Sequence, residues 1–274
     1  MLRFLFTTEF TIEWLMLLVV FGAGASYDSV PHHPPLASGA ADELRPPLAN
    51  ELFADRPQFV EAMKQFPDCL ALIPRLRKHG VVVEQELAIL QEQAKTFPPA
   101  LREIAAIRYY LHFILQQCQE SWRRFHFGIT NHAALLREIE RWRVETGESV
   151  CLVTFNYDTM IEEALSQVLH LDRRDIDDYI SREYPLVKLH GSANWGREVD
   201  GFVQPQDFRA QTLIDNVAVL DITRRYRLVT GYPMLTEGSP HEGFKIVFPA
   251  LSIPVENKDD FECPESHLKA LAGC

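Results

Sequence analysis

Hydrophobic and polar positions divide the chain into stretches of different periodicity. Continuous apolar runs at residues 15–21, 150–155 and 186–189 predict strands that are buried on both faces, as in a parallel sheet. Between the first two runs, from about 51 to 145, apolar residues recur every three or four positions and predict helices. Helical spacing returns at 159–169, directly after the second predicted strand. This alternation predicts an α/β fold.

The predicted architecture is a Rossmann-like, doubly wound parallel sheet with a helical insert after its first strand. We expect the sheet domain to comprise residues 16–50 and 146–274, and the insert residues 51–145. Residues 1–15 are interpreted as an upstream extension, with Met16 as the true start, because the LLVVF run that follows Met16 already supplies a strand of ordinary length.

The C-terminal third has weaker patterns. Residues 228–235 and 244–253 are interpreted as strands or extended segments. The chain stops at Cys274 within the helical pattern LKALAGC, with no strand after it. We therefore expect the sheet domain to be incomplete at this end, with an uncovered apolar strand edge or helix face near residues 246–274.

Composition and charge exclude several classes of function. The net charge of -11 makes a duplex nucleic-acid partner unexpected, since phosphate binding requires a basic surface. Five cysteines are widely spaced with no CxxC pair, which indicates reduced thiols in a cytoplasmic protein and neither a zinc site nor a disulfide framework. Glu9 and Glu13 interrupt the apolar N-terminal run, so neither a signal peptide nor a membrane span is predicted.

Three polar clusters follow the three predicted strands. They are GAGAS at residues 22–26, NYD at residues 156–158 and HGS at residues 190–192. Open α/β sheets bind ligands beyond the carboxyl ends of their strands. We therefore expect the three clusters to line one crevice.

Each cluster has a structural and a functional interpretation. GAGAS is either an ordinary turn or a phosphate-binding loop; Tyr27 stands where a dehydrogenase fingerprint has its third glycine. Asn156 and Asp158 could cap the next helix or both face the crevice, where amide and carboxylate would orient a sugar and a base. His190 could be structural or a general base, with Gly191 keeping space open beside it.

Together the three motifs resemble the sirtuin family in their order and spacing. They are most similar to the sirtuin-like NADases of bacterial anti-phage defence, which carry GAGAS, a long helical insert, FNYD and KLHGS. The resemblance implies that His190 acts as a base beside the nicotinamide ribose, that Asn156 contacts this ribose and that Asp158 lies near the nicotinamide amide. The residues implied in binding NAD are Gly22, Ala23, Gly24, Ala25, Ser26, Asp158, Gly191 and Ser192, with the first five approaching the phosphates.

Departures from the protein-deacylating sirtuins favour hydrolysis of NAD. Only Cys263 and Cys274 follow His190, so the four-cysteine zinc module of the deacylases is absent. The resemblance thus implies an NAD glycohydrolase that needs no metal and releases nicotinamide and ADP-ribose, or a cyclised ADP-ribose, as a defence by NAD depletion. It also implies control by a homo-oligomer or a partner protein of a defence system. Two alternatives are an NAD-dependent protein deacylase and a non-catalytic sensor that binds NAD or ADP-ribose.

Overall fold

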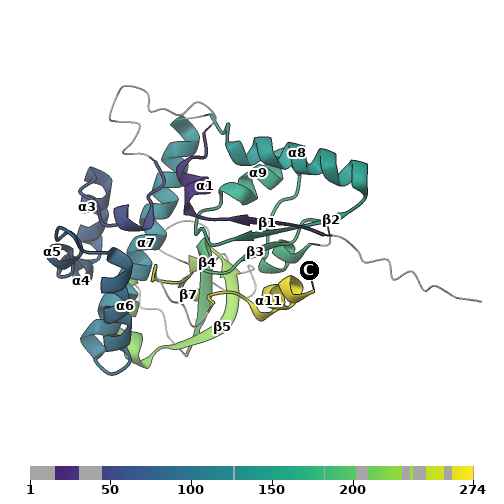
Figure 1. The fold of residues 1–274 in the computed structure, drawn as a ribbon. Coiled ribbons are helices and arrows are strands. Elements are labelled where there is room, and N and C mark those ends of the chain that lie inside the picture. The colour runs from purple at the N-terminus through teal and green to yellow at the C-terminus, as the bar shows by residue number, and fades with distance from the viewer. Residues whose placement is uncertain are drawn as a thin grey trace, which may run out of the picture.

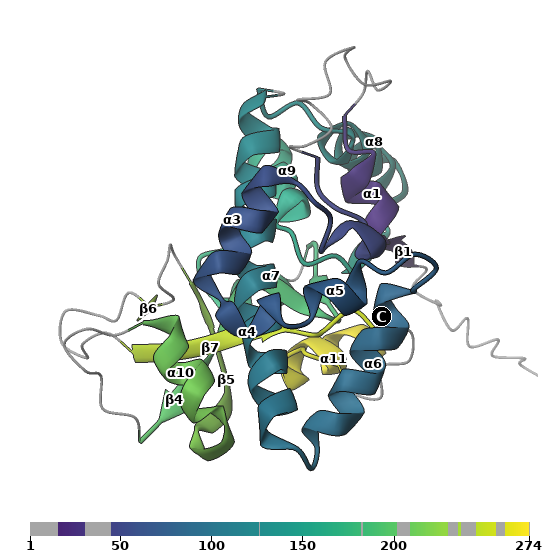
Figure 2. The ribbon, with the colours of Figure 1, turned by 90° about the vertical axis from the view of Figure 1, so that its left-hand side faces the viewer.

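The computed structural model describes residues 16–30, 45–125, 127–181, 183–201, 209–229, 235–236, 245–255 and 261–273. Within these ranges the chain forms a three-stranded parallel sheet and a four-stranded antiparallel sheet, with helices packed around them (Figure 1, Figure 2). The predicted α/β class is confirmed, whereas a single doubly wound parallel sheet is not what the chain forms.

The parallel sheet consists of the three apolar runs of the sequence. Its strands are β1 (Met16–Phe21), β2 (Ser149–Thr154) and β3 (Leu186–Lys188), in the order β1-β2-β3. Phe21 pairs with Thr154, and Thr154 with Lys188, so the carboxyl ends of the strands are aligned. The central strand β2 is buried from Val150 to Thr154, as its continuous apolar run predicts.

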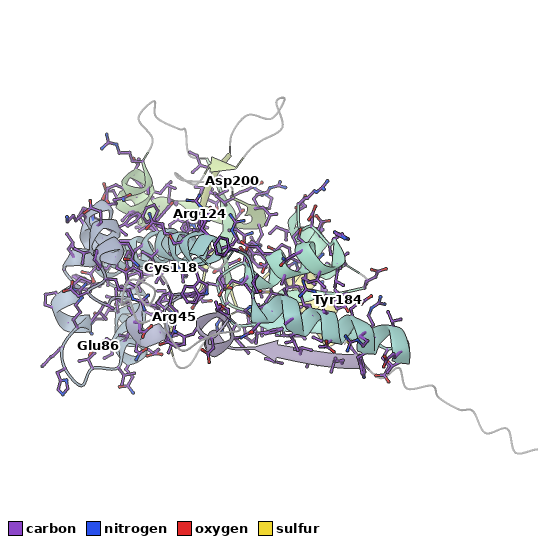
Figure 3. All side chains as sticks on the ribbon, turned by 90° about the horizontal axis from the view of Figure 1, so that it is seen from above. Arg45, Glu86, Cys118, Arg124, Tyr184 and Asp200 are labelled. Carbon is purple, nitrogen blue, oxygen red and sulfur yellow. The ribbon has the colours of Figure 1, made fainter. Side chains whose placement is uncertain are left out.

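Helices cover the parallel sheet on both sides. Helices α8 (Asn131–Thr146) and α9 (Met160–Leu169) lie on one face, and α11 (Glu265–Ala272) lies on the other (Figure 1). Gly147 ends α8 in a left-handed conformation with φ 74°, and its N–H donates to the Arg143 carbonyl at 2.8 Å. Tyr184 packs toward α8, where its hydroxyl donates to Glu140 at 2.7 Å (Figure 3).

Strand β1 differs from the prediction because it is covered on one face only. Leu17 and Val19 pack toward the α8 side, but Leu18 and Val20 are 50% and 55% exposed. Leu18 and Val20 pair with Cys151 and Val153 of β2. On this face α11 covers the two β2 residues but leaves Leu18 and Val20 accessible. An apolar run therefore indicated a strand correctly, but it could not tell an edge strand from a central one.

Helices dominate the stretch from residue 49 to residue 125, as predicted. Its longest helix is α7 (Pro98–Phe125), whose Gln116 side chain donates to the Ala193 carbonyl of the second sheet at 2.7 Å. The helices share one core with that sheet, so this stretch is part of the body of the protein. The shorter elements are η1 (Ala49–Glu51), α3 (Pro57–Gln65), α4 (Pro67–Leu70), α5 (Ile73–Leu76) and α6 (Val83–Ala94).

The second sheet is antiparallel, which corrects the predicted topology. Its order is β5-β4-β7-β6, and its strands are β4 (Gly191–Asp200), β5 (Asp221–Leu228), β6 (Leu235–Thr236) and β7 (Lys245–Leu251). Two residues, Leu189 and His190, join β3 to β4. A parallel crossover needs a dozen residues or more, so the chain cannot return to the first sheet over this distance.

The remaining predictions have mixed outcomes. Strand β7 and helix α11 confirm the extended and helical patterns near the end of the chain. The uncovered apolar strand expected there is not found among the described residues, since Ile246 to Leu251 are buried, although Phe261 is 50% exposed. The expectation for residues 1–15 lies outside the described residues. The other described elements are α1 (Ala23–Tyr27), η2 (Ile176–Ile180), α10 (Ala210–Asn216) and η3 (Val217–Val219).

Candidate functional site at the carboxyl edge of the parallel sheet

The GAGAS segment begins a short helix at the end of β1. Gly22 precedes α1, and Gly22, Ala23 and Gly24 are exposed. A Cβ atom added at Gly22 or Gly24 would meet nothing within 4 Å, and Gly22 has an ordinary φ of -107°. Neither packing nor backbone conformation within the described residues therefore requires these glycines. They leave open backbone that another molecule can approach closely.

Asn156 lies beneath this segment with only 6% of its surface exposed. Its Nδ2 donates to the Gly22 carbonyl at 2.9 Å and to Ser26 Oγ at 2.8 Å. This bonding fixes the amide, because the opposite orientation would place Oδ1 against the Gly22 carbonyl oxygen. Asn156 Oδ1 is buried and has no hydrogen-bond partner in the described part of the chain. Asn156 Oδ1 is therefore an unpaired acceptor with a fixed orientation.

Asp158 is also buried, and the protein uses both of its carboxylate oxygens. Ser26 Oγ donates to Oδ2 at 2.6 Å, and the Met160 N–H donates to Oδ1 at 3.1 Å. The second bond satisfies the amide of Met160, the first residue of α9, although the N-cap position of this helix is Thr159 and not Asp158. The implied contact between Asp158 and nicotinamide stays a prediction, and a structural role is evident without it.

A buried ion pair stabilises the turn that contains Asn156 and Asp158. Lys188 is fully buried, and its Nζ donates to the Asp158 carbonyl and, at 2.8 Å, to Glu162 Oε1. The Tyr179 hydroxyl donates to the same oxygen at 3.1 Å, and burial followed by the Glu162 charge raises the pKa of Tyr179. Sequence reasoning missed these residues, although a lysine inside the apolar run LVKL was a signal, since a buried charge requires a partner.

His190 lies beside the residues that flank Asn156. Its ring is centred 5.0 Å from the Phe155 ring and 6.3 Å from the Tyr157 ring. His190 is half-buried and Phe155 is 39% exposed, so this part of the edge is accessible to solvent. The His190 carbonyl accepts from the Ser252 N–H at 2.9 Å, which ties the turn to the segment after β7.

Gly191 and Ser192 have internal roles in the fold. Gly191 has a φ of 79°, and a Cβ atom there would lie 2.1 Å from the Ala250 carbonyl oxygen. The space beside Gly191 is thus filled by backbone and is not left open for His190. Ser192 is fully buried, and its Oγ donates to Asn194 Oδ1 at 2.6 Å. Contact of either residue with a ligand stays a prediction.

The structure therefore brings the three motifs to one edge of the parallel sheet. Ser26, Asn156 and Asp158 form one hydrogen-bonded network, and His190 lies next to it through its aromatic neighbours. His132 of α8 is a further neighbour that sequence reasoning missed. Its ring lies 5.8 Å from that of Phe21, and burial lowers its pKa while the Asp158 charge raises it.

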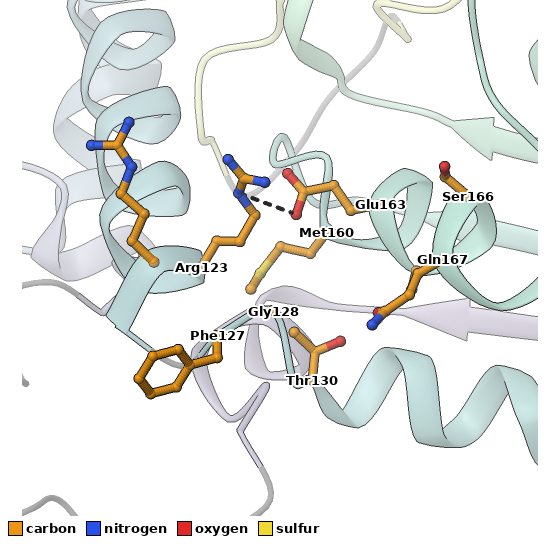
Figure 4. A pocket seen from close by; sticks show the side chains of 10 residues that line it. Arg123, Phe127, Gly128, Thr130, Met160, Glu163, Ser166 and Gln167 are labelled. Atoms are coloured by element: carbon orange, nitrogen blue, oxygen red, sulfur yellow. Dashed lines mark ion pairs between the residues drawn. The ribbon is translucent and has the colours of Figure 1, made fainter.

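A hollow in the surface lies apart from these motifs. It is formed between the end of α7 and helix α9, and Figure 4 shows Arg123 and Glu163 in it as an ion pair at 4.0 Å. Gly22, Asn156 and His190 do not line it. Its lining includes no more than four exposed side chains and no arrangement of polar groups aimed at a common point, so we assign no chemistry to it.

Comparisons with known proteins add no relative. No family model, curated protein or solved structure matches this chain. In the described ranges no helix is long and apolar enough to cross a membrane. The same ranges contain no group of three or more His, Cys, Asp or Glu side chains placed to hold a metal ion.

Proposed function

We propose that this protein cleaves the N-glycosidic bond of NAD, releasing nicotinamide and ADP-ribose, at the edge formed by Gly22, Asn156 and His190. The observation that carries the proposal is the buried carboxamide of Asn156. Its Nδ2 is occupied by the protein and its Oδ1 has no partner among the described residues, so the side chain presents one oriented acceptor. A ribose hydroxyl or a water molecule would satisfy it.

The proposed reaction needs positioning and charge stabilisation more than strong acids or bases. Nicotinamide leaves from a ribosyl carbon that gains positive charge, and water attacks that carbon. Asn156 Oδ1 would hold the ribose or the water, and His190 would accept the proton that the attacking group loses. Ala23 and Gly24 would offer their N–H groups to the phosphates, since the first amides of a helix have no partner within it.

The sequence resemblance supports a role in anti-phage defence by NAD depletion. A partner protein or a homo-oligomer would then control the activity, because unrestrained NAD hydrolysis harms the cell that makes the enzyme. Within these 274 residues only Cys263 and Cys274 follow His190, which favours hydrolysis over transfer to an acylated lysine.

Nicotinamide release from NAD by the purified full chain tests the proposal. Asn156→Ala and His190→Ala should each lower the rate, the latter by roughly 10²- to 10⁴-fold as expected for loss of a general base. His79→Ala is the matched control, because His79 is exposed in the turn between α5 and α6. Circular dichroism checks that all variants fold.

The outcomes separate the alternatives. Release without any peptide selects the glycohydrolase, and release that requires an acylated lysine peptide selects the deacylase. NAD or ADP-ribose binding without release selects the sensor. Undiminished turnover in both folded site variants would refute the assignment of Asn156 and His190.

A further inference from the structure

A cavity of about 810 Å³ is lined by helices α6, α7 and α11, strands β4 and β5, and residues 252–255 and 261–263. It is separate from the Ser26–Asn156–Asp158 network. One wall residue, Ser252, donates its N–H to the His190 carbonyl, so the cavity adjoins the turn that carries His190. Its volume is within the range that accommodates small-molecule ligands, ~300–1,000 Å³.

The charges on the wall do not cancel. Four cations line the cavity (Lys95, Arg108, Arg197 and Arg224) against three carboxylates (Glu92, Glu262 and Glu265). Each carboxylate has its own cation: Glu92 pairs with Lys95 at 2.6 Å, Glu262 with Arg197 at 3.4 Å, and Glu265 with Lys269 at 2.7 Å. Arg108 and Arg224 are left without an ion pair within the described residues, and Arg224 is exposed.

Arg108 is the informative residue. Its Nε is buried and has no hydrogen-bond partner in the described part of the chain, and its guanidinium lies 6.0 Å from the Phe248 ring centroid. Burial lowers the pKa of Arg108, while the Glu262 charge partly opposes this effect. Arginine nevertheless stays protonated in proteins. Arg108 is half-buried, with its Nε shut off from solvent and its charge without an ion-pair partner in the described ranges, so an anion bound in the cavity would supply that partner.

We propose that this cavity binds a small molecule that carries a phosphate or carboxylate group, with Arg108 as its principal contact. The planar guanidinium fork matches the geometry of an oxyanion. Arg197 completes the basic side but already donates to the Thr223 and Ile222 carbonyls, and Arg224 is exposed, which leaves Arg108 as the half-buried cation with free donors. The net charge of -11 disfavours unspecific anion binding elsewhere on the protein. The proposal does not depend on NAD cleavage.

Thermal unfolding and titration calorimetry test the site with two probes, inorganic pyrophosphate and citrate, against sodium chloride of equal ionic strength. Pyrophosphate represents the phosphate source and citrate the carboxylate source. The variants are Arg108→Met, which keeps the apolar stem, and Arg108→Lys, which keeps the charge without the fork. Arg124→Gln is the control, since Arg124 lies on the same helix but is exposed and pairs with Glu120 (Figure 3).

We expect at least one probe to raise the melting temperature of the wild type and of Arg124→Gln. Arg108→Met should bind that probe roughly tenfold more weakly or worse, without losing stability when no anion is present. The proposal is overturned if neither probe stabilises the wild type beyond sodium chloride, or if Arg108→Met binds as tightly as the wild type. Should Arg108→Met fail to fold, unchanged affinity in Arg108→Lys overturns it instead.

Discussion

Ser26 Oγ donates a hydrogen bond of 2.6 Å to Asp158 Oδ2 and so joins two motifs that lie 132 residues apart. The same hydroxyl accepts from Asn156 Nδ2 at 2.8 Å. One side chain therefore orients both the carboxamide and the carboxylate. The stability of this edge and the direction of Asn156 Oδ1 depend on the same atom.

The first prediction concerns this hydroxyl. Ser26→Ala leaves Asp158 Oδ2 buried without its donor, which should cost ~1–3 kcal/mol of unfolding free energy. NAD turnover should fall by more than the unfolded fraction of the variant explains, because Asn156 loses one of the two acceptors that orient it. Urea denaturation and NAD consumption measure the two effects. Ser149→Ala, at an exposed serine, should change stability by less than about 0.5 kcal/mol.

The second prediction separates glycines needed by a ligand from one needed by the fold. Gly24→Ala meets open space and should keep or raise stability by up to ~1 kcal/mol, while NAD binding weakens. Gly191→Ala combines a φ of 79° with a clash against Ala250 and should cost at least about 3 kcal/mol. Equal affinity for NAD in Gly24→Ala and the wild type would contradict the phosphate-approach role.

The sequence predicted the parallel sheet because its strands are short continuous apolar runs. Strand β4 escaped prediction because GSANWGREVD is rich in residues with low strand propensity. It is a strand through its position between β5 and β7, which pair with it on both sides and leave seven of its ten residues buried and two more half-buried. Such tertiary pairing is not encoded in local periodicity. The length of the link after β3 was the available signal against a single parallel sheet.

The site was predictable in its location and less so in its roles. Three polar clusters after three strands indicated one edge, and the Ser26–Asn156–Asp158 network lies there. Whether Asp158 binds a ligand or accepts from the first amide of α9 depends on the positions of individual atoms, which the spacing of residues in the sequence does not give. Lys188 was missed because its partner Glu162 is 26 residues earlier, on a helix whose orientation the sequence did not specify.

A third prediction concerns that buried pair. Lys188→Met leaves Glu162 without its cation and Asp158 without a donor to its carbonyl, and should cost ~3–5 kcal/mol. The double variant Lys188→Met with Glu162→Leu should be more stable than the single variant, because no uncompensated charge remains. A double-mutant cycle by urea denaturation measures this coupling. Additive losses would show that the two side chains stabilise the fold independently.

The last prediction concerns acid stability and comes from His112, which is buried in α7. Neither of its ring nitrogens has a hydrogen-bond partner among the described residues, and burial lowers its pKa from 6.5 to about 4. Between these values the unfolded chain binds a proton that the folded chain does not, so the free energy of unfolding falls as pH decreases from about 6.5 toward 4. The loss attributable to His112 has an upper value of about 3 kcal/mol. Burial lowers the pKa of His132 and His267 as well, and they act in the same direction.

His112→Leu should therefore flatten, without abolishing, the dependence of stability on pH, whereas His79→Gln at an exposed position should leave it in place. Denaturant titrations between pH 4 and 7 measure the slopes, and equal slopes in the wild type and His112→Leu would show that His112 is not a source of acid lability.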